Sequence, residues 1–304
     1  MRMPSPRVLL AGAALTAAVA TAATAFAAVT NPTPVLNNPG DEYAYRVSGT
    51  TSIWFQNTPA TRNHYNAYIR TAAGLQKLNA AGTTGYGGGV DGTTVIYQQA
   101  SNGVSHLFRY NVTTGTRTAL AAGFNVPQAW EFSPTVSGNW VLFGRQYNTG
   151  NEAIVLRNLG SGLQYIFAQN DARTNSDSPG QVNGDWAVWS VCNKNGCSVY
   201  RFQISTHTTT KLINTLPPAR FEYSPGVAAD GTAYYLHAGA KCGDHVRLVM
   251  HGVGQPETVL RSFSQGIDGF DSFVTPNPTT GTDYYWARQV CSTGRSDIYK
   301  VTNS

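Results

Sequence analysis

The chain alternates short apolar runs with polar turns, and the same arrangement of runs recurs six times. One set of runs carries matching residues at Phe55, Tyr97, Phe143, Trp189, Leu236 and Trp286, spaced 42 to 50 residues apart. A second apolar run follows each of these by 11 to 13 residues, as in "NAYIR", "HLFRY" and "DIYKV". Both sets are rich in aromatic and β-branched residues and are bounded by Gly, Asn, Asp or Ser. This composition is typical of strands paired through a hairpin.

Two further runs complete each repeat. A third run, such as "LQKL" or "LQYIF", follows the second one in five repeats and is absent from the sixth, which ends at "SDIYKVTNS". Another element precedes each anchor run, as in "WEFSPTVSG". Four strands in roughly 46 residues, without helical periodicity, are typical of a β-propeller blade. We therefore predict an all-β fold, a six-bladed β-propeller of four-stranded antiparallel blades. A sandwich or solenoid is the alternative, but neither explains six similar units.

The missing outer strand of the last blade is expected to come from the other end of the chain. An unpaired sheet edge invites aggregation, and Thr33 to Leu36 in "VTNPTPVLNNP" is suited to cover it. Its prolines fit an edge strand, where one side of the backbone needs no partner. The alternative is a disordered linker. The predicted organisation is a secretory leader at residues 1–28, a closing segment at 29–40 and the propeller at 41–304.

The first residues predict the compartment. "MRMPSPR" carries Arg2 and Arg7 and runs into the uncharged, Ala-rich stretch "VLLAGAALTAAVATAATAFA". This pattern predicts a secretory signal peptide, cut near Ala27 or Ala28. The alternative is a membrane anchor, since the run is about long enough to span a bilayer. We expect a secreted, extracellular protein that is not inserted in a membrane after cleavage.

Composition narrows the partners. Charged residues are 12% of the chain, and the formal charge falls from +5 to +3 without Arg2 and Arg7. No run of Lys or Arg forms a patch, so neither nucleic acid nor an anionic membrane is an expected partner. We expect a monomer whose partner is an extracellular protein, peptide or glycan.

Three repeats resemble a known family. Pro134 followed by "TVSGNWVLF", Pro179 followed by "QVNGDWAVW" and Pro225 followed by "GVAADGTAYYL" resemble the TolB-type propeller repeat, with its Pro, spacer, Asp-Gly-like turn and apolar strand. The resemblance extends over Asp41 to Ser304 and implies a six-bladed propeller. The chain departs from that pattern at Ser137 and Asn183, where Asp is replaced, and it lacks the family's leading assembly domain. Propellers of this kind include binding platforms and enzymes, so the fold alone does not select a function.

All four cysteines fall in loops between second and third strands. These loops share one face of a propeller, the top face, with the loops that lead into each next blade. An even cysteine count in an exported chain indicates disulfides. Three pairings are open, and we prefer Cys192 with Cys197, and Cys242 with Cys291. A zinc or copper site at His237, Cys242, His245, Met250 and His251 is the alternative, but we predict no metal and no cofactor.

Acidic and aromatic residues lie just ahead of several inner strands, where propeller symmetry would gather them at the top mouth of the central channel. Converging carboxylates bind cations or basic groups, and flanking aromatics stack on sugar rings or side chains. The alternative is that the acids satisfy backbone N–H groups at the loops. The predicted ligand-binding residues are Trp130, Glu131, Asp177, Phe221, Glu222, Tyr223 and Asp271.

No catalytic motif accompanies these residues. The sequence has no Gly-x-Ser-x-Gly elbow and no His-Glu-x-x-His. "GYGGGVDG", at Gly85 to Gly92, precedes a strand rather than a helix, so it is interpreted as a loop and a narrow inner strand rather than a phosphate loop. The sequence favours a non-catalytic binding propeller that uses its top face. The alternative is a hydrolase or lyase acting on a carbohydrate or lactone, with Glu131 and Glu222 as its acid and base.

Overall fold

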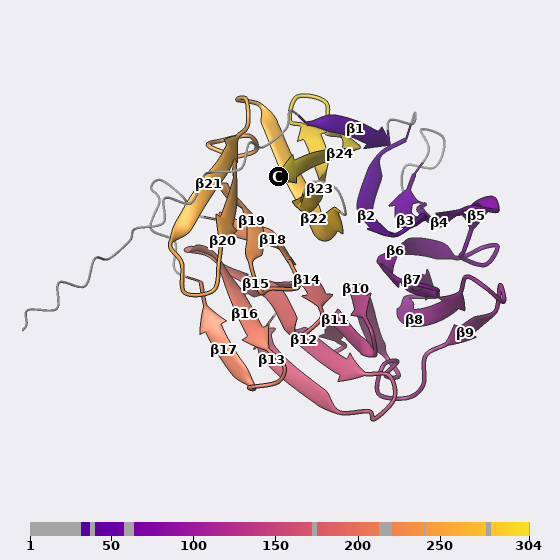
Figure 1. Ribbon diagram of the computed structural model, residues 1–304. Coiled ribbons are helices and arrows are strands. Elements are labelled where there is room, and N and C mark those ends of the chain that lie inside the picture. Colours follow the sequence, from indigo (N-terminus) through magenta and orange to yellow (C-terminus); the bar gives the residue numbers. More distant parts are fainter. Residues whose placement is uncertain are drawn as a thin grey trace, which may run out of the picture.

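The computed structural model describes residues 32–36, 40–57, 64–171, 175–212, 221–239, 241–277 and 281–303. The predicted leader at 1–28 lies outside these residues. The described chain forms antiparallel strands arranged as a ring, and colours in Figure 1 run once around it from indigo to yellow. None of the described segments forms an apolar helix of membrane-spanning length. The fold is all-β and propeller-like, as the repeat pattern predicts.

Each repeat contributes strands in the predicted order. The inner strands, around the axis of the ring, are β2 (Glu42–Ser48), β6 (Thr84–Asp91), β10 (Ala129–Ser137), β14 (Asn175–Asn183), β18 (Phe221–Val227) and β22 (Ile267–Asn277). The second strands are β3 (Thr51–Gln56), β7 (Thr94–Ser101), β11 (Trp140–Tyr147), β15 (Trp186–Asn193), β19 (Ala233–Ala238) and β23 (Gly281–Val290). The third strands are β4 (Asn66–Thr71), β8 (Val104–Asn111), β12 (Asn151–Asn158), β16 (Gly196–Gln203), β20 (Arg247–His251) and β24 (Arg295–Asn303). The outer strands are β5 (Gly74–Lys77), β9 (Arg117–Ala119), β13 (Gln164–Asp171), β17 (Thr208–Lys211), β21 (Glu257–Ser262) and β1 (Thr33–Leu36).

The sheets differ from the prediction in one respect. Four sheets are separate and four-stranded, but β6 to β9 and β10 to β13 belong to one eight-stranded sheet. The cause is a parallel bridge between Trp130 of β10 and Ser105 of β8. The prediction of six separate four-stranded blades is therefore wrong for this part of the ring.

The ring closes where the two ends of the described chain meet. β1 pairs antiparallel with β24, with Thr33 opposite Lys300 and Leu36 opposite Ile298. In Figure 1 the indigo β1 lies beside the yellow β24. β1 thus occupies the outer position that the last repeat lacks, and the edge of β24 is covered.

Apolar side chains from neighbouring sheets form the core. One cluster joins Ile96 and Leu107 of one repeat to Val136 and Phe143 of the next, all 5% exposed or less. Inner strands approach one another closely: a Cβ on Gly89 would lie 2.5 Å from the backbone nitrogen of Val136. The glycines of "GYGGGVDG" therefore permit the close packing of a narrow inner strand, as interpreted from the sequence.

On the face opposite the top face, the turns that follow the inner strands form hydrogen bonds between neighbouring repeats. The backbone N–H of Gly92 donates to Ser48 Oγ at 3.1 Å, and that of Gly138 donates to Asp91 Oδ2 at 2.6 Å. Gly184 donates in the same way to Ser137 Oγ at 3.0 Å. Ser can replace Asp in this turn because a hydroxyl oxygen also accepts a hydrogen bond.

Candidate functional site

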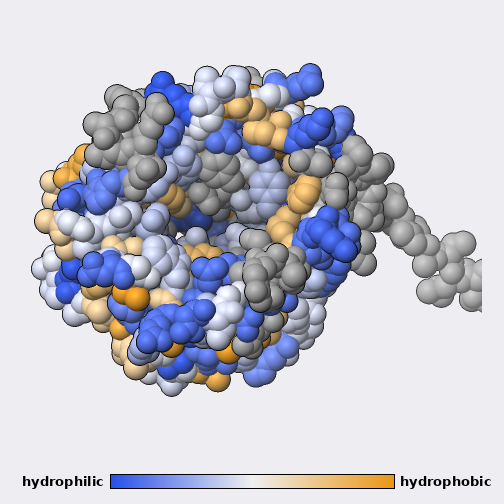
Figure 2. Space-filling model, turned by 180° about the vertical axis from the view of Figure 1, so that it is seen from behind, coloured by the Kyte–Doolittle hydropathy of each residue, from blue (hydrophilic) through white to orange (hydrophobic). Residues whose placement is uncertain are grey.

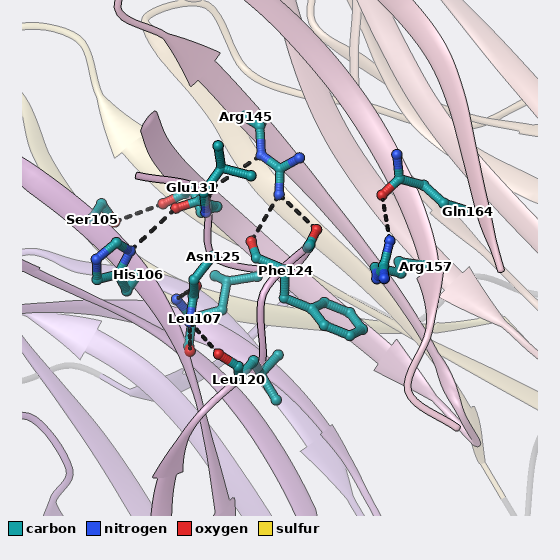
Figure 3. A network of polar contacts seen from close by, with 12 residues as sticks. Ser105, His106, Leu107, Leu120, Phe124, Asn125, Glu131, Arg145, Arg157 and Gln164 are labelled. Carbon is teal, nitrogen blue, oxygen red and sulfur yellow. Dashed lines mark hydrogen bonds and ion pairs between the residues drawn. The ribbon is translucent and has the colours of Figure 1, made fainter. Parts of the chain in front are cut away.

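Glu131 is a buried structural acid. Its side chain is fully buried, and Oε1 lies 3.1 Å from Arg145 Nε and accepts the Val126 backbone N–H at 3.1 Å. Oε2 lies 3.5 Å from His106 Nδ1, while Ser105 Oγ donates to the Glu131 carbonyl at 2.7 Å. Figure 3 shows these groups converging between β8, β10 and β11. The carboxylate therefore joins two repeats rather than facing solvent.

Arg145 extends this network to the segment that leads into β10. Its Nη2 donates to the carbonyl oxygens of Gly123 and Phe124 at 2.9 and 2.8 Å. The guanidinium is 3% exposed, so its charge is balanced by Glu131 within the protein rather than by water. The pair holds the connection between the two halves of the eight-stranded sheet.

Glu222 has the same kind of role. It is 3% exposed, and its Oε2 accepts the backbone N–H of Val199 in the preceding repeat at 3.1 Å. Asp177 and Asp271 lie in β14 and β22, but their side chains are outside the described part of the structure. For Glu131 and Glu222 the prediction of acids open at the channel mouth is wrong. The alternative reading, that the acids bind backbone N–H groups, describes both of them.

Aromatic residues, rather than Glu131 and Glu222, line the open surface at this end of the ring. Trp130 and Phe132 flank Glu131 on β10, and alternate strand residues point to opposite sides, so both rings leave the buried network. Both are half-buried and line a groove of about 370 Å³. The groove is formed by Tyr86, Gln98, Trp130, Phe132, Ser133, Gln146 and Glu152.

Local packing fixes the aromatic rings of the groove. Phe132 lies directly over Gly144 of β11, where any side chain would overlap its ring. Trp130 meets Tyr86 of β6 edge to face, with ring centroids 6.2 Å apart. Burial, followed by the neighbouring Tyr65, raises the pKa of Tyr86, so its hydroxyl stays protonated. The groove thus presents rigid apolar faces and one phenolic donor.

Polar side chains lie among these rings. Gln146 Nε2 donates to Glu152 Oε1 at 3.3 Å, and the two residues sit opposite each other on β11 and β12. Gln98 is 4% exposed, and its Oε1 accepts the backbone N–H of Ser133 at 3.3 Å. Aromatic walls with a few placed amides and carboxylates are typical of small-ligand sites.

A second cavity lies on the axis of the ring. It has a volume of about 70 Å³ and is lined by residues from all six inner strands, among them Ala44, Ser133, Ser178, Ser224 and Ser272. Figure 2 shows a hollow at the centre of the ring, seen from behind. Tyr86, Gln98 and Ser133 line both this cavity and the groove, so the two spaces adjoin.

Irregular backbone shapes the axial cavity. Ala44, Ser133 and Ser224 have φ values of 48°, 47° and 51°, in the left-handed region that residues with side chains rarely adopt. Each occurs where an inner strand shifts register against its partner. Conformations of this kind are retained where the surrounding structure fixes them, often at ligand sites.

Phe221 and Tyr223 are not among the residues that line the groove. Phe221 and Tyr223 lie on β18, and Tyr223 donates from its hydroxyl to Asp268 Oδ1 at 2.5 Å. Burial, followed by the charge of Asp268, raises the pKa of the Tyr223 hydroxyl. Of the predicted set, Trp130 is the residue that the described structure places at the groove.

The cysteines form the preferred pairs. Disulfides join Cys192 to Cys197, at the tip of the β15–β16 hairpin, and Cys242 to Cys291, between neighbouring repeats. Cys242 is thus not available as a thiolate ligand, and His245 Nε2 contacts Asp244 at 3.0 Å. Among the described residues no three His, Cys, Asp or Glu side chains are grouped so as to hold a metal.

Most of the groove escaped prediction from the sequence. Tyr86 lies in a glycine-rich segment, and Gln98, Gln146 and Glu152 come from second and third strands with no motif. The alternation of Trp130, Glu131 and Phe132 was a usable signal, because it puts both rings on the side opposite the acid.

The ring of antiparallel sheets with an axial cavity defines a β-propeller, and comparisons with solved structures agree with this class. TolB from Acinetobacter baumannii is 13% identical, with a TM-score of 0.54 over 88% of this chain and 66% of that chain. An oligogalacturonate lyase in complex with manganese is 9% identical, with a TM-score of 0.53 over 89% and 85% of the two chains. AofleA from Arthrobotrys oligospora is 9% identical, with a TM-score of 0.55 over 90% and 86%.

These similarities establish the fold alone. The chain spans just under two thirds of the Acinetobacter TolB chain. No family model matches the sequence, and no curated protein matches it. The neighbours include both TolB and a lyase, so a TolB-like propeller fold is shown and the function has to be argued from the groove.

Proposed function

We propose that this protein is an exported, non-catalytic β-propeller that binds a carbohydrate in the groove between Tyr86 and Trp130. The observation that carries the proposal is the groove itself, where half-buried aromatic rings surround Gln98, Gln146 and Glu152. Aromatic faces pack against the apolar face of a sugar ring, and amide and carboxylate groups bond its hydroxyls.

The rigidity of the groove supports ligand binding. Ring contacts continue from Tyr86 to Phe55 and Tyr65, with centroids 5.8 and 5.9 Å apart. Rings that are already packed lose little freedom when a ligand binds, so more of the contact energy is available as affinity.

We further propose that the eight-stranded sheet works as two blades, giving a six-bladed ring around one axial site.

The hydrolase or lyase alternative is less well supported. An acid and base of the glycosidase kind must reach the substrate, whereas Glu131 and Glu222 are buried and each accepts a backbone N–H. Neither carboxylate lines the groove or the axial cavity. The proposed role is therefore recognition rather than bond cleavage.

Export is proposed from two features. The N-terminal sequence has the pattern of a secretory leader. Two disulfides with no free cysteine among the described residues are typical of proteins that fold in an oxidising compartment. A periplasmic or extracellular location fits both features.

The test is glycan-array binding followed by calorimetry, with Trp130→Ala compared with Trp140→Ala. Trp140 is also half-buried, but it begins β11 at the opposite end of the same hairpin and packs on Tyr165 at 5.9 Å. We expect Trp130→Ala to weaken glycan binding at least tenfold and Trp140→Ala to leave it unchanged. Equal binding by the two folded variants would contradict a site in the groove.

A further inference from the structure

The groove and the axial cavity adjoin at three residues, and this contact defines what the ligand can carry. Tyr86, Gln98 and Ser133 line both spaces. A sugar ring stacked in the groove would therefore have one substituent directed at the cavity. The cavity, at about 70 Å³, is much smaller than the groove, at about 370 Å³, so it suits a substituent rather than a second sugar ring.

The cavity offers hydrogen-bond donors near its entrance. Gln98 is 4% exposed and uses Oε1 to accept the Ser133 N–H, while its Nε2 has no acceptor among the described residues. The hydroxyls of Ser133 and Ser178 also line the cavity, and neither makes a hydrogen bond within the described chain. An amide N–H and hydroxyl groups that make no bond within the described chain can donate to a ligand oxygen placed here.

Apolar groups also line the cavity, alongside the polar side chains of Arg46, Ser224 and Ser272. Pro134, Pro179 and Pro225 come from three successive inner strands, and Ala44 lies on a fourth. These groups suit a methyl group and would not satisfy a second polar atom. The lining therefore offers donors for a carbonyl oxygen beside apolar groups that suit a methyl group.

The charge of the cavity does not call for an anion. Arg46 lines it, but Nη1 donates to the Tyr45 carbonyl at 2.9 Å and the guanidinium stands 5.2 Å from the centre of the Phe273 ring. The guanidinium is thus already held by protein groups. A neutral acceptor fits this arrangement better than a carboxylate.

We infer that the ligand is an N-acetylated sugar, with its ring in the groove and its acetamido group in the axial cavity. This inference rests on the proposed function, since it assigns the substituent of a sugar bound at the same site. The acetamido oxygen would accept from Gln98 Nε2 and Ser178 Oγ, and its methyl would contact the prolines. Recognition would then depend on the sugar unit of the ligand whose acetamido group enters the axial cavity.

The test compares two trisaccharides that differ only in the substituent at carbon 2 of each sugar unit. Calorimetry of the full chain would use a β-1,4-linked trimer of N-acetylglucosamine and the corresponding glucose trimer, which has a hydroxyl in place of each acetamido group. We expect the wild type to bind the acetylated trimer at least tenfold more tightly. Equal affinity for both trimers would overturn the cavity assignment and leave the proposed groove intact.

Two variants probe the cavity separately from the groove. Gln98→Glu keeps an oxygen to accept the Ser133 N–H but removes the amide donor, and Ser178→Leu fills the cavity from β14, a strand that does not line the groove. Each should abolish the preference for the acetylated trimer, and Ser178→Leu, at a residue that lines the cavity but not the groove, should leave the affinity for the glucose trimer within about twofold. Retention of the preference in both folded variants would overturn the inference.

Two controls separate the possible failures. Trp130→Ala should lose both sugars, and if the wild type binds neither sugar, the proposed function fails together with the inference. Tighter binding of a glucuronic acid trimer than of the acetylated trimer would show that the cavity takes a carboxylate and would overturn the neutral ligand. Ser161→Leu, on the exposed turn before β13, controls for the added leucine.

Discussion

The two sides of β10 show how the same short sequence serves two purposes. On one side Glu131 is fully buried and bonded to Arg145 and to a backbone N–H. On the other side Trp130 and Phe132 stay half-buried around a groove of about 370 Å³. The acid, a residue type usually associated with catalysis, links neighbouring repeats. The aromatic residues, a type usually associated with hydrophobic cores, face the groove.

The difference follows from what each side must satisfy. Neighbouring repeats leave backbone N–H groups between them, and a carboxylate can accept those hydrogen bonds without water. Aromatic rings at the channel mouth need no partner and can leave one face open. Changes on the acid side are therefore expected to affect unfolding, and changes on the aromatic side to affect binding.

The largest effect is expected for Glu131→Ala. Its loss leaves Arg145 buried without its carboxylate and Val126 without an acceptor, so the free energy of unfolding should fall by about 3–5 kcal/mol. Urea unfolding followed by circular dichroism measures this. Glu152→Ala, at the groove, is the matched control and should change stability far less. Similar losses for both acids would remove the distinction between the two sides.

A pH dependence should come next in size, from His237, which is buried beside the second structural acid, Glu222. His237 is 1% exposed and lies opposite Glu222 in the β18–β19 register. Burial, then the charge of Arg247, lowers its pKa from 6.5 to about 4. The unfolded chain therefore binds more protons between these values, so the free energy of unfolding should fall as pH drops from 6.5 to 4.

The pKa shift of His237 limits how much its protonation can lower the free energy of unfolding. Each pKa unit corresponds to about 1.4 kcal/mol, so the loss from His237 reaches at most about 3 kcal/mol. His237→Gln should flatten this part of the pH profile, measured by urea unfolding at each pH. His245→Gln, an exposed histidine, should leave it unchanged. An unaltered slope in His237→Gln would mean that the histidine does not stay neutral in the folded protein.

A smaller effect is expected at the turns on the opposite face. Asp91 accepts the Gly138 N–H at 2.6 Å, and Ser137 accepts the Gly184 N–H at 3.0 Å. Asp91→Ala should cost about 1–2 kcal/mol and Ser137→Ala about 0.5–1 kcal/mol, because charged acceptors form the stronger bonds. Thermal unfolding of both variants gives the order. The reverse order would show that repeat-to-repeat bonding does not follow acceptor charge.

The smallest stability effect is expected at the groove. Gln146→Ala removes the bond to Glu152 on a half-buried surface, so stability should stay within about 0.5 kcal/mol of the wild type. Glycan affinity, measured by calorimetry, should fall by several-fold. A stability loss without any change in binding would mean that Gln146 supports the fold and does not contact the glycan.

Much of the ring was accessible from the sequence, and the site was not. The anchor residues Tyr97, Phe143 and Trp286 repeat because each fills the same core position, so their spacing reports the fold directly. The bridge between Trp130 and Ser105 depends on how two repeats lean together, which no local pattern records. The groove combines Tyr86 and Glu152 from neighbouring repeats, and the packing of those two repeats against each other brings them together.

The pairing of β1 with β24 sets an order of events during synthesis. Thr33 emerges from the ribosome long before Lys300, its partner in the register, so the last sheet stays incomplete until residue 300 has been made. Contacts this distant in sequence form slowly, and the waiting strand edge is open to other chains meanwhile. Ring closure should therefore be the step of maturation that is most sensitive to crowding and to chaperones that hold nascent chains apart.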